Sequence, residues 1–263
     1  MKPDYRNWIP KGMIHALTAL TGVLFVLLMI FGVFGLGVSR NVKIVLTIVL
    51  ALGDIVSAKC TEWAVHAYKA FSYDGERKLS RDIIEGTAEC VNIPDGGKAL
   101  DVGCGSGALA IAVAKLNPKA EVVGVDRWGK EYASFSLPLC SRNAEAEGVK
   151  NVRFMKGDAS HLDFPDESFD AVTSNYVYHN ISGKDKQTLL LETLRVLKKG
   201  GTFAIHDLMS PRRYGDMNAF VRKLQAMGYE RVELIDTAKG MFMTEGEAKR
   251  LMLTGSTLLT GRK

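Results

Sequence analysis

The sequence has few cysteines, and their spacing forms no pattern that would hold a metal or a disulfide framework. The four cysteines are Cys60, Cys90, Cys104 and Cys140, and no two of them form a C-x-x-C pair. This spacing excludes the usual zinc sites and the small disulfide-rich folds, and it is typical of a reduced cytosolic setting. We therefore predict no metal site.

The sequence also lacks a dense run of basic residues. Its net charge of +5 arises from 34 Lys and Arg against 29 Asp and Glu, and the two signs are interleaved along the later part of the chain. A nucleic-acid-binding surface gathers its basic residues into a patch or stripe, so nucleic acid is not an expected partner. A P-loop, a zinc spacing and a Ser/His/Asp arrangement are missing as well.

No residue from Gly12 to Ser39 has a formally charged side chain. Within this stretch the run LTALTGVLFVLLMIFGVFGLGV is longer than the roughly 20 residues that cross a hydrocarbon core. We therefore predict a transmembrane helix. The alternative is a secretory signal peptide, but that would have a shorter apolar region and a small-residue cleavage site.

A second apolar stretch, Ile44 to Ala58, follows the short polar link from Ser39 to Asn41. It is shorter than the first and contains Asp54, so we expect it to cross with Lys43 and Lys59 reaching outward at its two ends. The alternative is a helix that lies on the membrane or packs against the rest of the protein.

Basic residues before and after the two apolar stretches outnumber those in the link between them. By the positive-inside rule, both ends of a spanning hairpin are then cytoplasmic. We predict that residues 1–66 form a membrane-anchoring helical hairpin and that residues 67–263 form a second domain, held at the cytoplasmic side of the cell membrane. The residues counted are Lys2, Arg6 and Lys11 before, Lys59 and Lys69 after, and Arg40 and Lys43 between.

From about His66 onward, short β-branched runs alternate with helical patterns. This alternation predicts an α/β fold, with a mostly parallel sheet covered by helices on both faces. The last strand is joined without a full crossover helix, so we expect it to run antiparallel. The predicted strands are 98–103, 120–126, 152–158, 169–176, 202–208, 231–236 and 256–263, and the predicted helices are 108–116, 131–147, 185–197 (ended by the glycines of KKGG), 212–227 and 244–252.

The first of these strands runs into a glycine-rich loop, ALDVGCGSGALA. Gly103, Gly105 and Ala108 fit the G-x-G-x-x-A spacing of a dinucleotide-binding turn, whereas Gly103, Gly105 and Gly107 fit a G-x-G-x-G spacing that suits a different ligand. In both cases the glycines let the backbone approach the ligand and the next helix directs its first N–H groups at it. The glycines alone do not decide between the two.

Three carboxylates near the predicted strand ends favour a ligand without phosphate. Asp101 precedes the loop and would repel a pyrophosphate. Asp126 ends the second strand, where a carboxylate reaches ribose hydroxyls, and Asp158 ends the third, where it could accept from an exocyclic amine. No Lys or Arg lies in the loop. These residues predict S-adenosylmethionine, a positively charged nucleoside.

Residues 98–207 resemble a class I S-adenosylmethionine-dependent methyltransferase, of the group that includes ubiquinone/menaquinone, sterol and small-molecule methyltransferases. The matching segments, in the family's order, are LDVGCGSG, VVGVD, FMKGDASHLDFPDESFDAV, SNYVYHNI and LRVLKKGGTFAIHD. The resemblance implies a Rossmann-like seven-stranded sheet, mostly parallel with an antiparallel last strand, here preceded by two hydrophobic helices.

The resemblance also implies which residues hold the cofactor. It assigns Asp101, Gly103 and Gly105 to the methionine portion, Asp126 to the ribose hydroxyls, and Arg127 to the flank of the adenine.

Further along the chain, Asp158 and the backbone of Ala159 would read the adenine edge, and Asn175 would lie under the sulfonium. Tyr73, in FSYDGERK, occupies the segment that often closes over the cofactor in such enzymes. The alternative for Tyr73 is a packed aromatic at a helix start.

An aromatic group follows the ribose-binding position, where the sequence departs from the family. Trp128, Tyr132 and Phe135 could cover the adenine face. Their helical spacing favours the alternative, in which they are core residues of a helix.

Two histidines are candidates for a general base. His179, and His206 with Asp207, end the fourth and fifth strands and would face the acceptor. A base is needed only if the acceptor loses a proton, and a purely structural histidine is the alternative for each. The absence of an N-P-P-Y motif disfavours DNA and glutamine acceptors.

These observations predict a membrane-anchored methyltransferase with a small-molecule or lipid substrate, such as a quinone. Tethering would concentrate the enzyme near a lipophilic acceptor. Two alternatives are an NAD(P)-dependent oxidoreductase, which the Ala108 spacing allows, and a non-catalytic membrane adaptor that senses the cofactor. The sequence specifies neither the acceptor atom nor the oligomeric state.

Overall fold

The computed structural model describes residues 2–129 and 134–263. It divides into two compact units, one formed by Asn7–Lys78 and the other by Met1–Arg6 together with Leu79–Lys263. We call these the hairpin unit and the sheet unit. The division lies beyond residue 66 because one helix of the hairpin runs unbroken to Ala70. The predicted functional domains, 1–66 and 67–263, stay a prediction.

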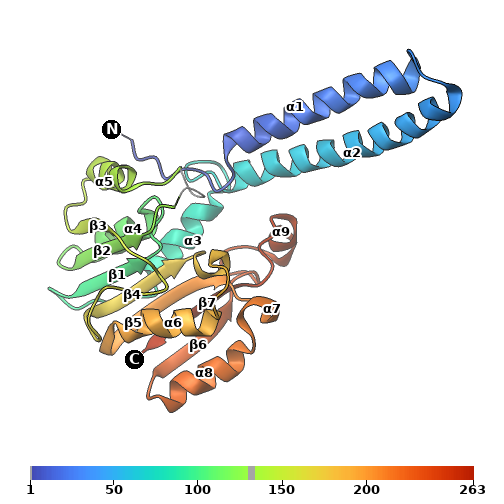
Figure 1. Cartoon of the computed structure of the whole chain (residues 1–263). Helices are drawn as coiled ribbons and strands as arrows, with labels where there is room; N and C mark the ends of the chain where they lie inside the picture. The colour runs from blue at the N-terminus through green and yellow to red at the C-terminus, as the bar shows by residue number, and fades with distance from the viewer. Residues whose placement is uncertain (1, 130–133) are drawn as a thin grey trace. The chain divides into compact units, whose positions relative to one another are not determined.

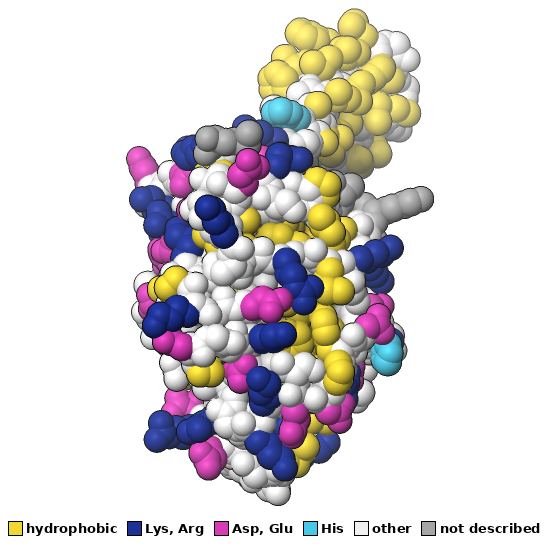
Figure 2. Space-filling view, turned by 90° about the vertical axis from the view of Figure 1, so that its left-hand side faces the viewer, with side chains coloured by type: hydrophobic (Ala, Val, Ile, Leu, Met, Phe, Trp, Pro, Cys, Tyr) yellow, Lys and Arg dark blue, Asp and Glu magenta, His cyan; other side chains and the backbone are white. Residues whose placement is uncertain are grey.

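The hairpin unit contains two long helices joined by a short turn (Figure 1). Helix α1, Lys11–Leu27, continues as the π-helical segment η1, Leu28–Val33, and α2 spans Arg40–Ala70. Both are long and apolar enough to cross a membrane, judged by length and composition. Large apolar side chains on them are exposed, and Figure 2 shows apolar side chains over the visible hairpin surface. The exposure is the pattern expected of helices that face lipid.

Small polar side chains line the seam between the two helices. The Thr21 hydroxyl contacts Ser57 Oγ at 2.8 Å and Thr61 Oγ1 at 3.4 Å. The Thr47 hydroxyl donates to the Lys43 carbonyl of its own helix at 2.8 Å and also lies 3.2 Å from the Gly32 carbonyl. Small residues let helix backbones approach closely, which is how helices associate in lipid.

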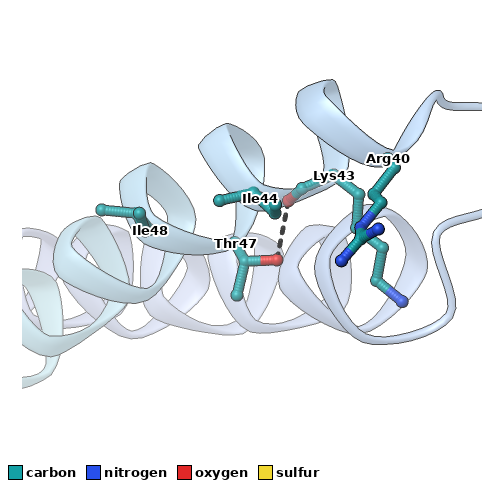
Figure 3. A pocket seen from close by; sticks show the side chains of 5 residues that line it. All are labelled: Arg40, Lys43, Ile44, Thr47 and Ile48. Atoms are coloured by element: carbon teal, nitrogen blue, oxygen red, sulfur yellow. Dashed lines mark hydrogen bonds between the residues drawn. The ribbon is translucent and has the colours of Figure 1, made fainter.

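The turn end of the hairpin carries two basic side chains (Figure 3). Lys43 Nζ donates to the Val33 carbonyl at 2.7 Å, which satisfies a backbone group left open at the end of η1. Arg40 and Lys43 line an open pocket together with Ile44, Thr47 and Ile48.

The sheet unit is built around seven strands in the order β3-β2-β1-β4-β5-β7-β6. β7 is antiparallel to both of its neighbours, and the pairs from β3 to β5 are parallel. The predicted fold is therefore confirmed. The strands are β1 Lys98–Val102, β2 Glu121–Asp126, β3 Val152–Lys156, β4 Phe169–Asn175, β5 Leu197–Leu208, β6 Glu230–Asp236 and β7 Ser256–Arg262.

Helices cover both faces of the sheet (Figure 1). α3, Leu79–Ala88, α4, Ala108–Leu116, and α5, Leu137–Ala146, pack on one face, and α6, Lys186–Arg195, with α8, Met217–Ala226, on the other. Every residue from Ala108 to Ala114 is buried, so α4 is a core helix without a polar face. The short elements are η3 Tyr178–Asn180, α7 Pro211–Tyr214 and α9 Glu245–Arg250.

Three predicted helices differ in the structure, and local capping explains the first two. The helix expected from residue 131 begins at Leu137, because the Ser136 side chain accepts from Leu139 N and caps it there. Residues 130–133 of that prediction lie outside the described residues. The helix expected over 212–227 is two helices, because the Asp216 side chain accepts from Ala219 N and starts α8 anew.

The third difference concerns the glycines after α6. α6 ends at Arg195 without them, and the chain enters β5 at Leu197. Gly200, at φ 77°, lies instead in an irregularity of β5, where the pairing with β4 shifts register between Phe169 and Ala171. The left-handed glycine thus serves a bulge in the strand and not a helix end.

Candidate functional site

The glycine-rich loop lies between β1 and α4, at the carboxyl ends of the parallel strands. Gly103 N and Cys104 N both donate to the Val125 carbonyl, at 2.8 and 3.0 Å, which holds the loop against the end of β2. Gly103 has φ 75°, a left-handed conformation that favours glycine. A Cβ on Gly103 would lie 2.3 Å from Val177 Cγ2, so the segment after β4 packs directly on the loop.

Asp101, directly before this loop, is a buried carboxyl group with a hydrogen bond to only one of its two oxygens among the residues described. Its side chain is 1% exposed. Oδ1 accepts from Thr173 Oγ1 at 3.0 Å, whereas Oδ2 is buried with no hydrogen-bond partner among the residues described. Burial raises the pKa of Asp101 to about 7. Such an oxygen costs free energy until a donor reaches it, and a cation is the donor it favours most.

Asp126, at the end of β2, braces the same loop. Oδ2 accepts from Gly105 N at 2.9 Å and Oδ1 from Trp128 N at 2.7 Å. A carboxylate has about four acceptor positions, so these two bonds leave capacity for hydroxyl donors. The Trp128 indole donates to the Gly105 carbonyl at 2.9 Å, a contact that the sequence did not indicate.

Of the aromatic group predicted after Asp126, Trp128 and Phe135 do not lie in a helix. Phe135 is half-buried and precedes α5, and its ring lies 3.9 Å from where a Cβ on Gly105 would be. The helical interpretation is therefore wrong for Phe135, since the Ser136 cap starts the helix after it. Tyr132 lies outside the described residues.

The predicted adenine-edge residues lie at the end of β3. Asp158 is exposed, and its Oδ1 accepts from Ser160 N at 2.8 Å. Hydrogen bonds from Ser160 lower the pKa of Asp158, and the charges of Lys184 and Arg127 lower it further, so Arg127 lies within electrostatic reach. Ala159 is half-buried beside them. Their roles toward adenine stay predictions.

His179, in η3, and Asp207, near the end of β5, form a hydrogen-bonded pair. His179 Nδ1 lies 2.5 Å from Asp207 Oδ1, with the His179 side chain 16% exposed and the Asp207 side chain fully buried. Asp207 Oδ2 also accepts from Tyr178 N at 2.8 Å and from His179 N at 3.2 Å. A buried carboxylate with this many donors holds the imidazole in one orientation.

Asp207 is ionised in this setting. Burial opposes its ionisation, but the hydrogen bond and charge of His179, followed by the Leu208 N–H, outweigh burial and hold the pKa of Asp207 below its ordinary value. With Nδ1 bonded to Asp207, Nε2 is the His179 atom that remains for a proton from an acceptor.

His206 lies in a different environment from His179. It is fully buried, its Nδ1 contacts the Asn175 amide at 2.8 Å, and its Nε2 contacts Thr237 Oγ1 at 2.9 Å. Burial lowers the pKa of His206 to about 4, so the ring is neutral. Both nitrogens are engaged, which leaves neither for an acceptor.

The segment before the hairpin belongs to the site region, a feature that sequence reasoning missed. The buried Asn143 amide on α5 accepts from Asp4 N at 2.8 Å, donates to the Asp4 carbonyl at 3.0 Å and donates to the Ser106 carbonyl of the glycine-rich loop at 3.0 Å. Tyr5 Oη donates to Glu147 Oε1 at 3.1 Å. No local signal marks a contact between residues 139 positions apart.

Two further predictions concern Tyr73 and the binding of a metal ion. Tyr73 belongs to the hairpin unit, and its closure over a cofactor stays a prediction. Within residues 2–129 and 134–263, no group of three or more His, Cys, Asp or Glu side chains could hold a metal ion.

Comparison with known proteins identifies the family. A family model described as a methyltransferase domain matches residues 93–251, which is more than half of the chain. The chain therefore belongs to this family of methyltransferase domains, and the predicted class is confirmed.

Curated relatives match part of the chain. A demethylmenaquinone methyltransferase of Geobacillus kaustophilus is 36% identical over 126 residues, covering 48% of this chain and 51% of that protein. An uncharacterized methyltransferase of Bacillus subtilis, YcgJ, is 39% identical over 114 residues, covering 43% and 42%. A sterol 24-C-methyltransferase of Aspergillus fumigatus is 33% identical over 139 residues, covering 52% and 35%. The matched segments span about half or less of these relatives.

Solved structures share the fold. The cyclase SpnF superposes with a TM-score of 0.55 at 20% identity, covering 73% of this chain and 85% of that one. A geranyl diphosphate methyltransferase superposes with a TM-score of 0.53 at 15% identity, covering 75% and 83%. A cyclase and a methyltransferase on one architecture show that the fold alone does not decide the reaction.

We predict that Gly103→Ala destabilises the sheet unit more than Gly148→Ala does. Both glycines have left-handed φ, 75° and 69°, but a Cβ at Gly148 meets nothing within 4 Å. The free energy of unfolding should fall by about 1 kcal/mol for Gly148→Ala and by about 2–4 kcal/mol for Gly103→Ala, which adds a clash with Val177. Urea unfolding in detergent measures both, and equal losses would contradict the packing described here.

Proposed function

We propose that this chain is an S-adenosylmethionine-dependent methyltransferase that acts on a small lipophilic acceptor at a membrane. The observation that carries the proposal is the buried Asp101 Oδ2, which has no hydrogen-bond partner in the part of the chain that the structure describes and lies directly before the glycine-rich loop of a methyltransferase domain. The amino group of the cofactor's methionine portion is a cation that would satisfy this oxygen.

The residues present fit the cofactor. Asp101, Gly103 and Gly105 would hold the methionine portion, and Asp126 would accept from the ribose hydroxyls while it continues to brace the loop. When bound, the cofactor supplies a methyl group on a positively charged sulfur. Asp101 also disfavours the dinucleotide alternative, because a pyrophosphate would be repelled at this position.

His179 would act as the general base for an acceptor that loses a proton. Its Nε2 would take the proton of an acceptor hydroxyl, and the buried Asp207 carboxylate would stabilise the resulting imidazolium through the Nδ1 hydrogen bond of 2.5 Å. The deprotonated acceptor would then take the methyl group as the bond from that methyl to the sulfur breaks, which leaves S-adenosylhomocysteine as the neutral product. The pair thus favours an acceptor with an acidic hydroxyl, such as a phenol or hydroquinone.

Two further observations support this class of acceptor. Relatives such as the demethylmenaquinone methyltransferase of Geobacillus kaustophilus are named for a quinone, and reduction of a quinone gives two ring hydroxyls. The two apolar helices would hold the enzyme where such a lipid is concentrated. We therefore propose a hydroxylated aromatic ring with an apolar tail, methylated at the cytoplasmic face of the cell membrane.

We predict that His179→Gln and Asp207→Asn lower the rate of methyl transfer without a matching loss of cofactor affinity. Loss of a general base or of its orienting carboxylate should reduce kcat by about 10²–10⁴-fold. The measurement is transfer of label from isotopic S-adenosylmethionine to the quinol fraction of a membrane extract, with binding of S-adenosylhomocysteine followed by calorimetry.

The matched control is His161→Gln, because His161 is an exposed histidine on the loop after β3, with a side chain 81% exposed. It should retain the rate of the unsubstituted protein. Transfer by His179→Gln at that rate would contradict the base assignment, and no labelled compound with the unsubstituted protein would contradict the proposed function.

The hairpin predicts a specific pattern of protease protection. In sealed vesicles with the cytoplasmic face outward, protease should remove a tag at the C terminus and leave a tag inserted at Arg40 intact, because that turn would lie across the membrane. Detergent should expose both tags. Removal of both tags before detergent is added would contradict a spanning hairpin.

A further inference from the structure

The turn end of the hairpin unit has two cationic side chains and no acidic residue near them in the sequence. Arg40 begins α2, and Lys43 follows within the first turn of that helix. Both line one pocket, and Figure 3 shows them extending in the same direction from α2. The sequence contains no Asp or Glu between Asp4 and Asp54. Two like charges without a counter-charge repel each other, and an anion placed between them relieves that repulsion.

Lys43 is held in place by its surroundings. Its Nζ donates to the Val33 carbonyl at 2.7 Å, which uses one of the three ammonium protons. The stem of the side chain crosses Gly35, where a Cβ would lie 2.8 Å from Lys43 Cδ. Gly35 has φ 69°, so glycine suits both the conformation and the space. A donor that is already ordered loses less conformational freedom when it binds an anion.

Arg40 supplies the donors that recognise a phosphate. The residue is exposed, and its guanidinium makes no hydrogen bond or ion pair with any residue that the structure describes. A guanidinium presents its N–H groups as a planar fork that matches two oxygens of a phosphate, whereas an ammonium acts as a point charge beside it. Arg40 and Lys43 together therefore fit a phosphate better than either does alone.

The rest of the pocket is apolar and follows α2 away from the two cations. Ile44 and Ile48 line it one helical turn apart, and they are 51% and 56% exposed. The Thr47 hydroxyl between them donates to the Lys43 carbonyl at 2.8 Å, so its proton is already used within the helix. A ligand that combines an anionic head with a hydrocarbon chain would use both parts of the pocket.

The position of the pocket along α2 matches the level of a lipid headgroup. Arg40 and Lys59 lie roughly 28 Å apart along the helix at 1.5 Å per residue. The hydrocarbon core of a bilayer is about 30 Å thick. When Lys59 lies at one membrane surface, the pocket therefore lies at the other. In the orientation proposed above, this is the surface away from the cytoplasm.

We propose that the pocket of Arg40, Lys43, Ile44 and Ile48 binds one anionic phospholipid. The phosphate lies between the two cations, and an acyl chain follows the two isoleucines. The inference rests on the membrane-spanning part of the proposed function and is independent of the cofactor and the acceptor. A zwitterionic lipid has the same phosphate but also a cation of its own, so the pocket favours a lipid with net negative charge.

Lipid binding to the full-length protein tests the charge requirement. Native mass spectrometry in a neutral detergent counts bound lipid as phosphatidylglycerol, or phosphatidylcholine with the same acyl chains, is added. We expect phosphatidylglycerol to bind more tightly, and Arg40→Gln to weaken its binding about fivefold. The matched control is Lys59→Gln, because Lys59 is an exposed cation of the same helix that is paired with Glu62 at 2.7 Å. This control should keep the affinity of the unsubstituted protein.

Two glycines separate a built pocket from diffuse attraction to a charged turn. Gly35→Ala and Gly37→Ala both place a Cβ at left-handed φ, 69° and 71°, and neither changes the charge. The new Cβ meets the Lys43 side chain only at Gly35, whereas at Gly37 it meets nothing within 4 Å. Gly35→Ala should therefore weaken phosphatidylglycerol binding about fivefold, and Gly37→Ala should leave it unchanged. Equal affinities of these two variants would overturn the pocket, even if Arg40→Gln weakens binding.

Inorganic phosphate distinguishes a lipid site from a simple anion site. It lacks an acyl chain, so it should not displace phosphatidylglycerol, and displacement would overturn the lipid assignment.

The outcomes also separate this inference from the proposed function. If the protease experiment shows a spanning hairpin and both lipids bind equally, the anchor stands and the lipid pocket is overturned. If protease removes the tag at Arg40 before detergent is added, the spanning hairpin itself is contradicted.

Discussion

A single buried carboxyl group, that of Asp101, determines which kind of ligand the site favours. Asp101 is enclosed at the base of the glycine-rich loop, where Thr173 satisfies one of its oxygens and no described residue satisfies the other. Burial raises the pKa of Asp101 to about 7, because a carboxylate enclosed without a paired cation is poorly solvated. A positively charged group entering the loop removes that penalty, so the cost that Asp101 adds to the unliganded fold is recovered as affinity and selectivity for a cation.

Asp101, Asp207 and His206 are buried ionisable groups at the strand ends. Their protonation differs, and the surroundings of each side chain explain why. Asp101 has one oxygen without a hydrogen-bond partner among the described residues, and burial raises its pKa to about 7. Asp207 is equally buried, but several donors keep it ionised, so it can hold His179 in place. His206 is neutral because it is buried among groups that bond it without charge. The same shell of side chains thus combines a carboxyl group with a raised pKa, an ionised carboxylate and a neutral imidazole.

The sequence predicts the features that depend on local pattern and misses those that depend on distant partners. Helix 108–116 is predicted to the residue, because its apolar run begins directly after the glycine-rich loop. The start of α5 is missed, since it depends on the Ser136 cap and not on the helical spacing of Phe135. The pairing of His179 with Asp207 and the contacts of Asn143 with Asp4 could not be foreseen, because only the folded sheet brings these residues together.

The proton balance of ligand binding tests the central role of Asp101 most directly. Calorimetry of S-adenosylhomocysteine binding in buffers of different ionisation enthalpy counts the protons released. Because the amino cation of the ligand stabilises the carboxylate, the pKa of Asp101 should fall from about 7, so binding near neutral pH should release protons and should weaken as the pH drops further. The release should disappear in Asp101→Asn. Binding without proton release, or an unchanged release in that variant, would contradict the account.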